Sequence, residues 1–194
     1  LMVKTMADIF SGNHTRIQFT PDLLPADIIG TKIYKIKSES FHIEKGPIFH
    51  NFILADEINR APPKVQSALL EAMQEKQVSI HGETLNIDKP FIVFATQNPI
   101  EHEGTYKLPE AQVDRFALKI FVDYPSKEEE LEIIEMNTKG IETKISSIIS
   151  VNEILEIQKF NEKIYADRTV LNYVTQIVDA TRNPKKYGLD LENI

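Results

Sequence analysis

The sequence predicts an α/β fold in which a parallel sheet flanked by helices is followed by a helical lid. Two short apolar runs, Phe52–Ala55 and Phe91–Thr96, have the length and composition of strands that are buried on both faces. Apolar residues at helical spacing lie between the two runs. Beyond residue 125 the pattern is helical, so we place one domain at residues 1–125 and a lid at residues 126–194.

The first quarter of the chain is predicted to form a helix, a strand and an irregular segment. Residues 1–10 carry apolar side chains at helical spacing. Residues 16–19 alternate between polar and apolar, as in a strand with one buried face. A stretch with proline and glycine follows, and within it residues 41–49 are predicted to form a short hairpin.

The remaining elements follow from local turn and capping signals. A helix is predicted to begin at Pro62-Pro63, because the first turn of a helix tolerates proline. Gln77–Ile80 and Thr84–Ile87 flank a glycine-containing turn, which is typical of a hairpin. Leu118–Val122 is predicted to be a third sheet strand. Ser126, with a glutamate three residues later, is predicted to cap the first lid helix.

Composition excludes several classes of protein. The 194 residues are 42% hydrophobic and 26% charged, as in an ordinary globular protein. No apolar run approaches 18 residues and no signal peptide is present, so we expect no membrane insertion. The absence of cysteine excludes disulfides and fits a cytoplasmic location. A net charge of −7 makes nucleic-acid binding over the whole surface unfavourable.

The first predicted site consists of Asp56 and Glu57, which come directly after the first apolar run. The carboxyl ends of parallel strands are where open α/β sheets bind ligands. An aspartate there can hold Mg²⁺ through water, and the following glutamate can polarise a water for attack on a phosphate. This is the pattern of a Walker B element. The same pattern also arises where a strand simply ends at a surface.

Asn98 and Arg115 are two further site residues, each with an alternative interpretation. Asn98 follows the second apolar run and can position a water or contact a γ-phosphate, or it can simply belong to an Asn-Pro turn. Arg115 lies just before the predicted third strand and can reach a phosphate on a neighbouring subunit as an arginine finger. Its alternative is a surface ion pair with Asp114 or Glu110.

Other chemistries lack a signal in the sequence. No Gly-x4-Gly-Lys-Ser/Thr loop is present, so the chain has no phosphate-cradling P-loop. The triplet Glu101–Glu103 contains one histidine and has no second ligand cluster at zinc-binding spacing. The absence of cysteine excludes a thiol nucleophile.

Several blocks together resemble the MoxR family of AAA+ ATPases. These blocks occur in the family's order and cover residues 16–25, 56–75, 95–99 and 103–116, with a further similar segment at 180–184. The resemblance implies a P-loop NTPase-like fold with a helical lid. It also implies that residues 22–50 include a helix-2 insert and that residues 76–88 form a pre-sensor-1 hairpin, insertions that face the pore or partner in related rings.

The resemblance assigns roles to the candidate residues. It implies that Asp56 organises Mg²⁺, that Glu57 is the catalytic base and that Asn98 is sensor 1. These three would contact ATP and its metal, whereas Arg115 would act as the arginine finger on the adjacent subunit. The Walker A loop expected before Leu1 and the sensor 2 arginine expected after Ile194 are not in the sequence. We therefore expect a piece of a longer ATPase that is inactive alone.

The implied function is ATP hydrolysis coupled to chaperone-like remodelling or maturation of partner proteins. Family resemblance implies a homo-oligomer, expected to be a hexameric ring, with partners such as von Willebrand A domain proteins. Two other hypotheses remain at this point. One is a ring motor of the helicase or magnesium-chelatase type, and the other is a non-hydrolysing interaction module.

Overall fold

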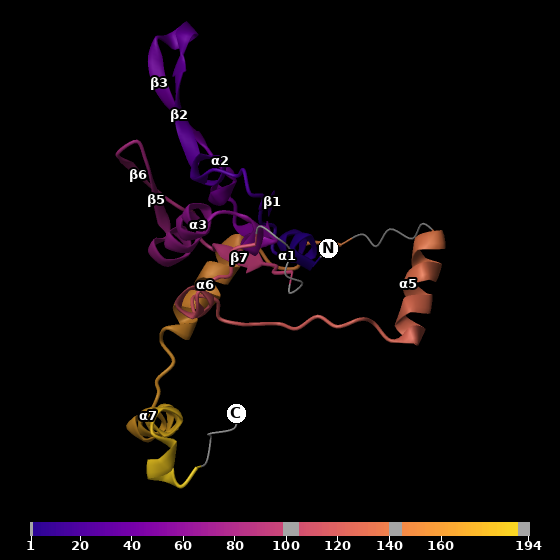
Figure 1. The fold of residues 1–194 in the computed structure, drawn as a ribbon, viewed down its shortest axis with the longest axis vertical. Coiled ribbons are helices and arrows are strands. Elements are labelled where there is room, and N and C mark those ends of the chain that lie inside the picture. Colours follow the sequence, from indigo (N-terminus) through magenta and orange to yellow (C-terminus); the bar gives the residue numbers. More distant parts are fainter. Residues whose placement is uncertain (1, 99–104, 140–144, 190–194) are drawn as a thin grey trace. The chain divides into compact units, whose positions relative to one another are not determined.

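The computed structural model describes residues 2–98, 105–139 and 145–189 (Figure 1). In chain order, the helices, short 3-10 helices (η) and strands are α1 (Met2–Ile9), β1 (His14–Gln18), α2 (Pro25–Ile29), β2 (Gly30–Lys35), η1 (Ile36–Ser38), β3 (Ser40–Lys45), η2 (Pro47–Phe49), β4 (Phe52–Asp56), η3 (Ile58–Arg60), α3 (Pro63–Glu75), β5 (Gln77–Ile80), β6 (Glu83–Asn86), β7 (Ile92–Ala95), α4 (Glu110–Val113), α5 (Lys127–Lys139), α6 (Val151–Asn161), α7 (Arg168–Arg182) and η4 (Pro184–Tyr187).

The central sheet consists of three parallel strands in the order β1-β4-β7. Both predicted apolar runs form strands, β4 and β7, but only β4 is buried on both faces as predicted, because β7 is the end strand of the described sheet and is only partly buried. The register pairs Gln18 with Asp56 and Ala55 with Ala95. The carboxyl ends of all three strands therefore meet at one edge, which brings together segments about 40 residues apart in sequence.

Side chains of β4 alternate between two apolar layers, as expected of a strand covered on both faces. Ile53 and Ala55 are fully buried against residues from α3, α2 and η2. Phe52 is fully buried in a second cluster with Val3 and Ala7 of α1, as predicted for the N-terminal helix. Helices thus cover both faces of the sheet.

Helix α3 begins at Pro63, as predicted, and ends where Lys76 adopts a left-handed conformation with φ 54°. Its buried face contributes Val65, Leu69 and Ala72 to the main core. The hairpin predicted after this helix is confirmed as β5–β6. Hairpin β5–β6 and its neighbour β2–β3 are joined by an ion pair between Lys32 and Glu83 at 2.5 Å.

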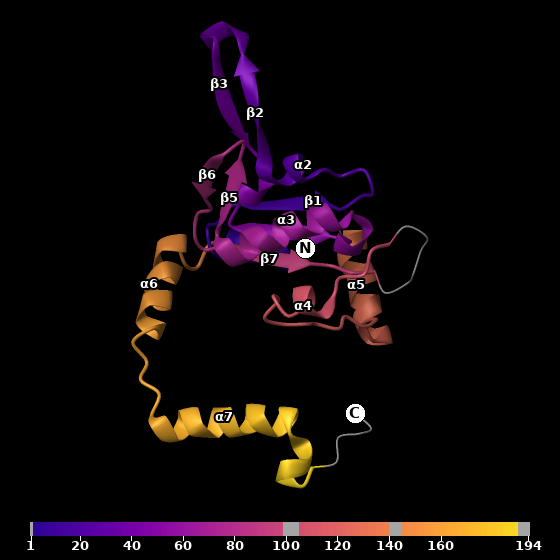
Figure 2. The same ribbon diagram turned by 60° about the vertical axis from the view of Figure 1, so that its left-hand side comes forward.

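A second hairpin, β2–β3, extends from the end of α2 (Figure 2). The prediction of a hairpin within 41–49 is wrong in its position. The two strands pair along their whole length, with Gly30 opposite Lys45 at one end and Lys35 opposite Ser40 at the end beside the turn. Of the two strands only β3 overlaps the predicted range, and Pro47–Phe49 forms a 3-10 turn instead. Gly30 has φ +101°, and a Cβ there would lie 2.2 Å from the carbonyl oxygen of Glu44, so the base of the hairpin requires glycine.

The predicted third sheet strand at Leu118–Val122 is not formed. These residues are irregular, and most of their apolar side chains are exposed, for example 78% for Leu118 and 91% for Val122. A strand forms only where a neighbour accepts its main-chain hydrogen bonds, and composition alone does not supply that neighbour.

The helical pattern after residue 125 is confirmed by α5, α6 and α7. The predicted capping box at the start of α5 is present, with Ser126 N–H donating to Glu129 Oε2 at 2.7 Å and Glu129 N–H donating to Ser126 Oγ at 3.3 Å. None of the helices in the described part of the chain is long and apolar enough to cross a membrane.

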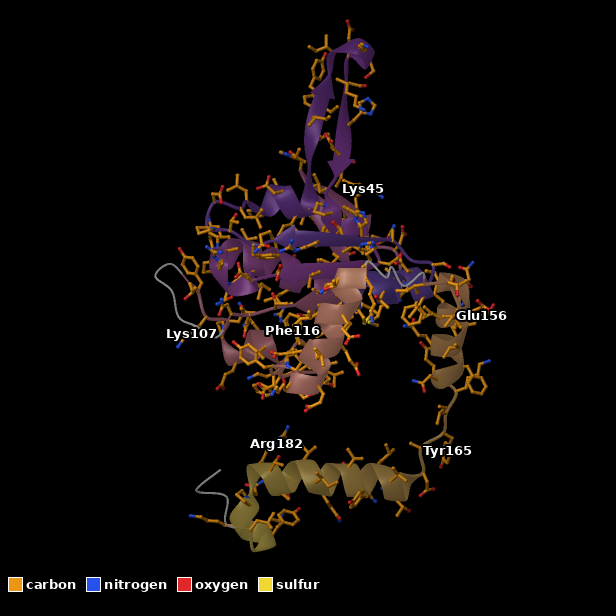
Figure 3. All side chains as sticks on the ribbon, turned by 90° about the vertical axis from the view of Figure 1, so that its right-hand side faces the viewer. Lys45, Lys107, Phe116, Glu156, Tyr165 and Arg182 are labelled. Atoms are coloured by element: carbon orange, nitrogen blue, oxygen red, sulfur yellow. The ribbon has the colours of Figure 1, made fainter. Side chains whose placement is uncertain are left out.

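By its internal contacts the chain divides into two units, residues 1–155 and 156–194. Figure 3 labels Glu156, the first residue of the second unit, and Arg182, the last residue of α7. The second unit contains α7 and η4, joined through Asp179, which accepts hydrogen bonds from Tyr187, Lys186 and Asn183. The proposed domain boundary at 125/126 remains a prediction.

Candidate active site

Asp56 and Glu57 lie at the carboxyl edge of the sheet, where the sequence predicts them. Asp56 is the last residue of β4, and Glu57 follows with φ 54° and ψ 50°. A left-handed glutamate is uncommon, and such conformations gather at functional sites. Both side chains are accessible, at 22% and 28% exposed, so a ligand in solvent can reach them.

The Asp56 carboxylate is held from both sides, by a residue of β1 and by the residue that directly follows β7. On one side, Arg16 of β1 donates to Oδ2 from Nε at 3.0 Å and from Nη2 at 2.5 Å. On the other, the hydroxyl of Thr96 donates to Oδ1 at 2.5 Å. The hydrogen bond from Thr96, followed by those from Arg16, holds the pKa of Asp56 below its ordinary value of 3.8. Asp56 is therefore ionised at neutral pH.

The Glu57 carboxylate is oriented by two donors on the same oxygen. Gln18 Nε2 donates to Oε2 at 3.0 Å, and Arg60 Nη1 donates to Oε2 at 2.9 Å. The Glu57 N–H donates to Thr96 Oγ1 at 2.9 Å. Both of these side-chain contacts fall on Oε2, so they leave Oε1 accessible for a further hydrogen bond.

These contacts close into a ring of hydrogen bonds. Arg16 Nη2 donates to Gln18 Oε1 at 2.6 Å, which connects the residue that holds Asp56 with the residue that holds Glu57. Thr96 completes the ring on the opposite side, since it touches both acidic residues. A closed network of charged and polar groups orients its members more firmly than isolated pairs do.

The carboxylate of Asp56 fits a magnesium ion held through water. Its three hydrogen bonds leave an acceptor position on Oδ1, and its lowered pKa keeps it charged. In the described ranges, no cluster of three or more histidine, aspartate or glutamate side chains gathers to hold a metal. One charged carboxylate with a free acceptor position is what sites need in which one or two carboxylates and substrate phosphates share Mg²⁺.

Asn98 lies just beyond β7 and is tied to the turn that follows Glu57. Its carbonyl oxygen accepts a hydrogen bond from Nδ2 of Asn59 at 3.3 Å. The main chain of Asn98 therefore lies near the same edge of the sheet as the two acidic residues. The Glu101–Glu103 triplet lies outside the described residues.

Arg115 is held at a different place, against helix α3. Its Nη1 donates to the carbonyl oxygen of Leu70 at 3.1 Å. Arg115 lies two residues after the end of α4. The described contacts thus bring Asp56 and Glu57 together, tie Asn98 to the same edge, and leave Arg115 on a separate segment.

Four polar residues of the site were not predicted from sequence: Arg16, Gln18, Arg60 and Thr96. The alternation of residues 16–19 was a usable signal, because it places Arg16 and Gln18 on one face at the end of a strand. Pairing of β1 with β4 then brings that face beside the acidic pair. Without knowledge of the pairing, the same residues look like an ordinary solvent-facing edge.

Comparisons with known proteins identify the family and agree with the fold. Residues 1–118 match the family described as "ATPase family associated with various cellular activities (AAA)". The crystal structure of a candidate ATPase from Cytophaga hutchinsonii is similar with a TM-score of 0.87 and 52% identity, covering 96% of this chain and 57% of that one.

Curated relatives cover nearly the whole chain. Chaperone MoxR1 of Mycobacterium tuberculosis is 53% identical over 98% of this chain and 50% of its own length, and YeaC of Bacillus subtilis is 46% identical over 94% and 57%. Protein MoxR of Paracoccus denitrificans is 31% identical over 98% and 59%. The chain thus spans between half and three fifths of these relatives, and it belongs to the MoxR family of AAA+ ATPases.

Proposed function

We propose that the full-length protein containing this chain hydrolyses ATP with Mg²⁺ and uses the energy to remodel or mature partner proteins. The observation that supports this most strongly is the acidic pair at the sheet edge, with Asp56 held in its charged form and Glu57 oriented by Gln18 and Arg60. The name of the relative Chaperone MoxR1 supports the remodelling part of the proposal.

In this proposal each residue has one task. Asp56 holds the metal through water, and Glu57 takes a proton from the attacking water at Oε1. Asn98 contacts the γ-phosphate, and Arg115 reaches the phosphates bound to the neighbouring subunit. When bound, Mg²⁺ would offset negative charge on the phosphates. Preorganised charged groups of this kind supply most of the stabilisation in phosphoryl transfer.

The anchoring of Arg115 on α3 supports a role toward a neighbour. Its guanidinium donates to the carbonyl oxygen of Leu70, whereas Asp56 and Glu57 are bound to residues of β1 and to Thr96, which directly follows β7. An arginine finger supplied in trans requires an assembly, and we propose a homo-oligomeric ring, with six subunits as the expected number. We propose a cytoplasmic location and protein partners such as those with von Willebrand A domains.

The experiment is a phosphate-release assay on the full-length protein with ATP, with and without Mg²⁺. We expect turnover that stops when the metal is chelated, together with assembly in the presence of ATP. A protein that binds no nucleotide would instead support a non-hydrolysing interaction module. DNA binding that weakens steeply with salt would support a helicase-type motor, although the net charge of −7 disfavours it.

A further inference from the structure

Two polar side chains are buried beside the turn that carries Glu57. Among the described residues, Gln66 is 1% exposed and Asn59 is 8% exposed, and the fold buries no other polar or charged side chain to this extent. Burying an amide costs free energy unless its polar atoms are paired. Both amide NH2 groups donate to main-chain carbonyl groups and so fix the positions of backbone segments, whereas the buried Oδ1 of Asn59 has no partner among the described residues.

Gln66 joins two segments that are far apart in sequence. Its Nε2 lies 3.1 Å from each of three carbonyl oxygens, those of Ile58, Ala61 and Tyr106. An amide NH2 has two hydrogens, so the three acceptors share them. Ile58 and Ala61 belong to the turn that follows Glu57, whereas Tyr106 begins the segment that leads through α4 to Arg115.

Asn59 strengthens the same junction from the other side. Its carbonyl oxygen accepts a hydrogen bond from the N–H of Tyr106 at 2.6 Å, and its Nδ2 donates to the carbonyl of Asn98 at 3.3 Å. Tyr106 is therefore held through its N–H by Asn59 and through its C=O by Gln66.

The other end of this segment is fixed to the same helix. Arg115 donates to the carbonyl oxygen of Leu70, which follows Gln66 by four residues. Residues four apart lie on one face of a helix, about one turn from each other. Helix α3 thus holds both the beginning of the segment, at Tyr106 through the Gln66 side chain, and its end, at Arg115 through the main-chain carbonyl of Leu70.

We propose that Gln66 is a positioning residue that sets where Arg115 is presented and links it to the turn that carries Glu57. This inference rests on the proposed function. In that function Glu57 belongs to the nucleotide site of its own subunit, and Arg115 reaches the nucleotide site of the neighbouring subunit. Gln66 then links the turn at the first site to the arginine that acts at the second. A displacement of about 1 Å in a catalytic group can cost about 10²-fold in rate.

The test uses Gln66→Met in the full-length protein, because methionine keeps the length and apolar packing of the side chain but donates no hydrogen bond. We expect kcat to fall about 10²-fold, as for a misplaced catalytic group, with ATP affinity little changed. Gln74→Met is the matched control, since Gln74 is exposed on the same helix, and we expect it to leave turnover unchanged.

Subunit mixing then separates a defect in the presented arginine from a defect in the subunit's own site. Glu57→Gln subunits have an inactive site but an intact Arg115, so mixing them with Gln66→Met subunits should restore turnover at the mixed interfaces. Mixing Glu57→Gln with Arg115→Ala subunits should give the same rescue and serves as the positive control. A general structural defect in Gln66→Met would not be rescued in this way.

Three outcomes would overturn the role of Gln66 and leave the proposed function standing. They are full turnover by Gln66→Met, reduced turnover without rescue on mixing, and weakened ATP binding as the main effect. If Gln66→Met does not fold, Gln66→Asn carries the same test, because it keeps the amide but withdraws it by one methylene group. Absence of turnover in the unmodified protein, or full turnover by Arg115→Ala, would instead overturn the proposed function.

Discussion

The hydroxyl of Thr96 donates a hydrogen bond to Oδ1 of Asp56 at 2.5 Å. The same hydroxyl accepts a hydrogen bond from the N–H of Glu57. One small side chain at the end of β7 therefore fixes both the carboxylate proposed to hold the metal and the backbone that orients the proposed base. The site depends on three adjacent strands rather than on the acidic pair alone.

Replacing Thr96 with valine should weaken both the fold and the site. Valine keeps the β-branched shape but removes the two hydrogen bonds, each worth about 1 kcal/mol, with more for the bond to a charged group. Because Thr96 is exposed to solvent, we take the low end of both contributions and expect the free energy of unfolding at pH 7, measured with urea, to fall by about 2–3 kcal/mol. Thr84→Val is the control, since within the described residues the Thr84 hydroxyl contacts Ser79 at a long 3.4 Å, and its replacement should change little.

The effect of Thr96→Val should also depend on pH. Because the pKa of Asp56 is lowered in the folded state, its contacts stabilise the fold above the ordinary value of 3.8, and this contribution is lost as pH falls through the lower folded-state value. The stability difference between the unmodified protein and Thr96→Val should therefore shrink in acid. A difference that grows below pH 3.8 would contradict the assigned contacts of Asp56.

Arg115→Ala should abolish turnover by the full-length protein and spare nucleotide binding. Removing an arginine finger costs about 10³-fold or more in rate, whereas the nucleotide is bound mainly by other groups. Steady-state ATP hydrolysis and equilibrium binding of a fluorescent nucleotide measure the two effects. Arg168→Ala, an exposed arginine at the start of α7, is the control and should behave normally. Near-normal turnover by Arg115→Ala would exclude the finger role.

Asp179 offers a separate test in the second unit. Hydrogen bonds from Tyr187, Lys186 and Asn183 lower the pKa of its carboxyl from 3.8 to about 2. Tyr187→Phe removes the largest of these contributions, so an NMR titration should show the pKa of Asp179 rising toward 3.8. The contacts stabilise the α7–η4 junction above pH 3.8 and are lost as pH falls through about 2. An unchanged pKa in Tyr187→Phe would show that the two side chains do not interact in solution.

The elements with strong periodic patterns could be predicted from sequence. Strand β4 is covered on both faces and helix α3 on one, and each leaves the apolar pattern that such burial requires. The β2–β3 hairpin was misplaced because its exposed strands mix lysine with apolar residues and carry no clear alternation. The apolar residues at 118–122 formed no strand, because strand formation depends on a pairing partner elsewhere in the chain.

In the active site too, some residues can be found from the local sequence and others only from the tertiary structure. Asp56 and Glu57 are adjacent and follow a recognisable strand, so local sequence is sufficient to find them. Arg16 and Thr96 each lie 40 residues from Asp56, and only the β1-β4-β7 register brings them to it. Gln66 was assigned to a helix that was predicted correctly, but its three carbonyl partners depend on tertiary structure.

The most direct test of the central claim is a comparison of ATP binding and hydrolysis between the unmodified full-length protein and Glu57→Gln. Glutamine is nearly isosteric with glutamate and can keep its place beside Gln18 and Arg60, but it cannot take a proton from water. The account predicts that Glu57→Gln binds ATP normally and retains it unhydrolysed. Rapid hydrolysis by Glu57→Gln would contradict the assignment of Glu57 as the base.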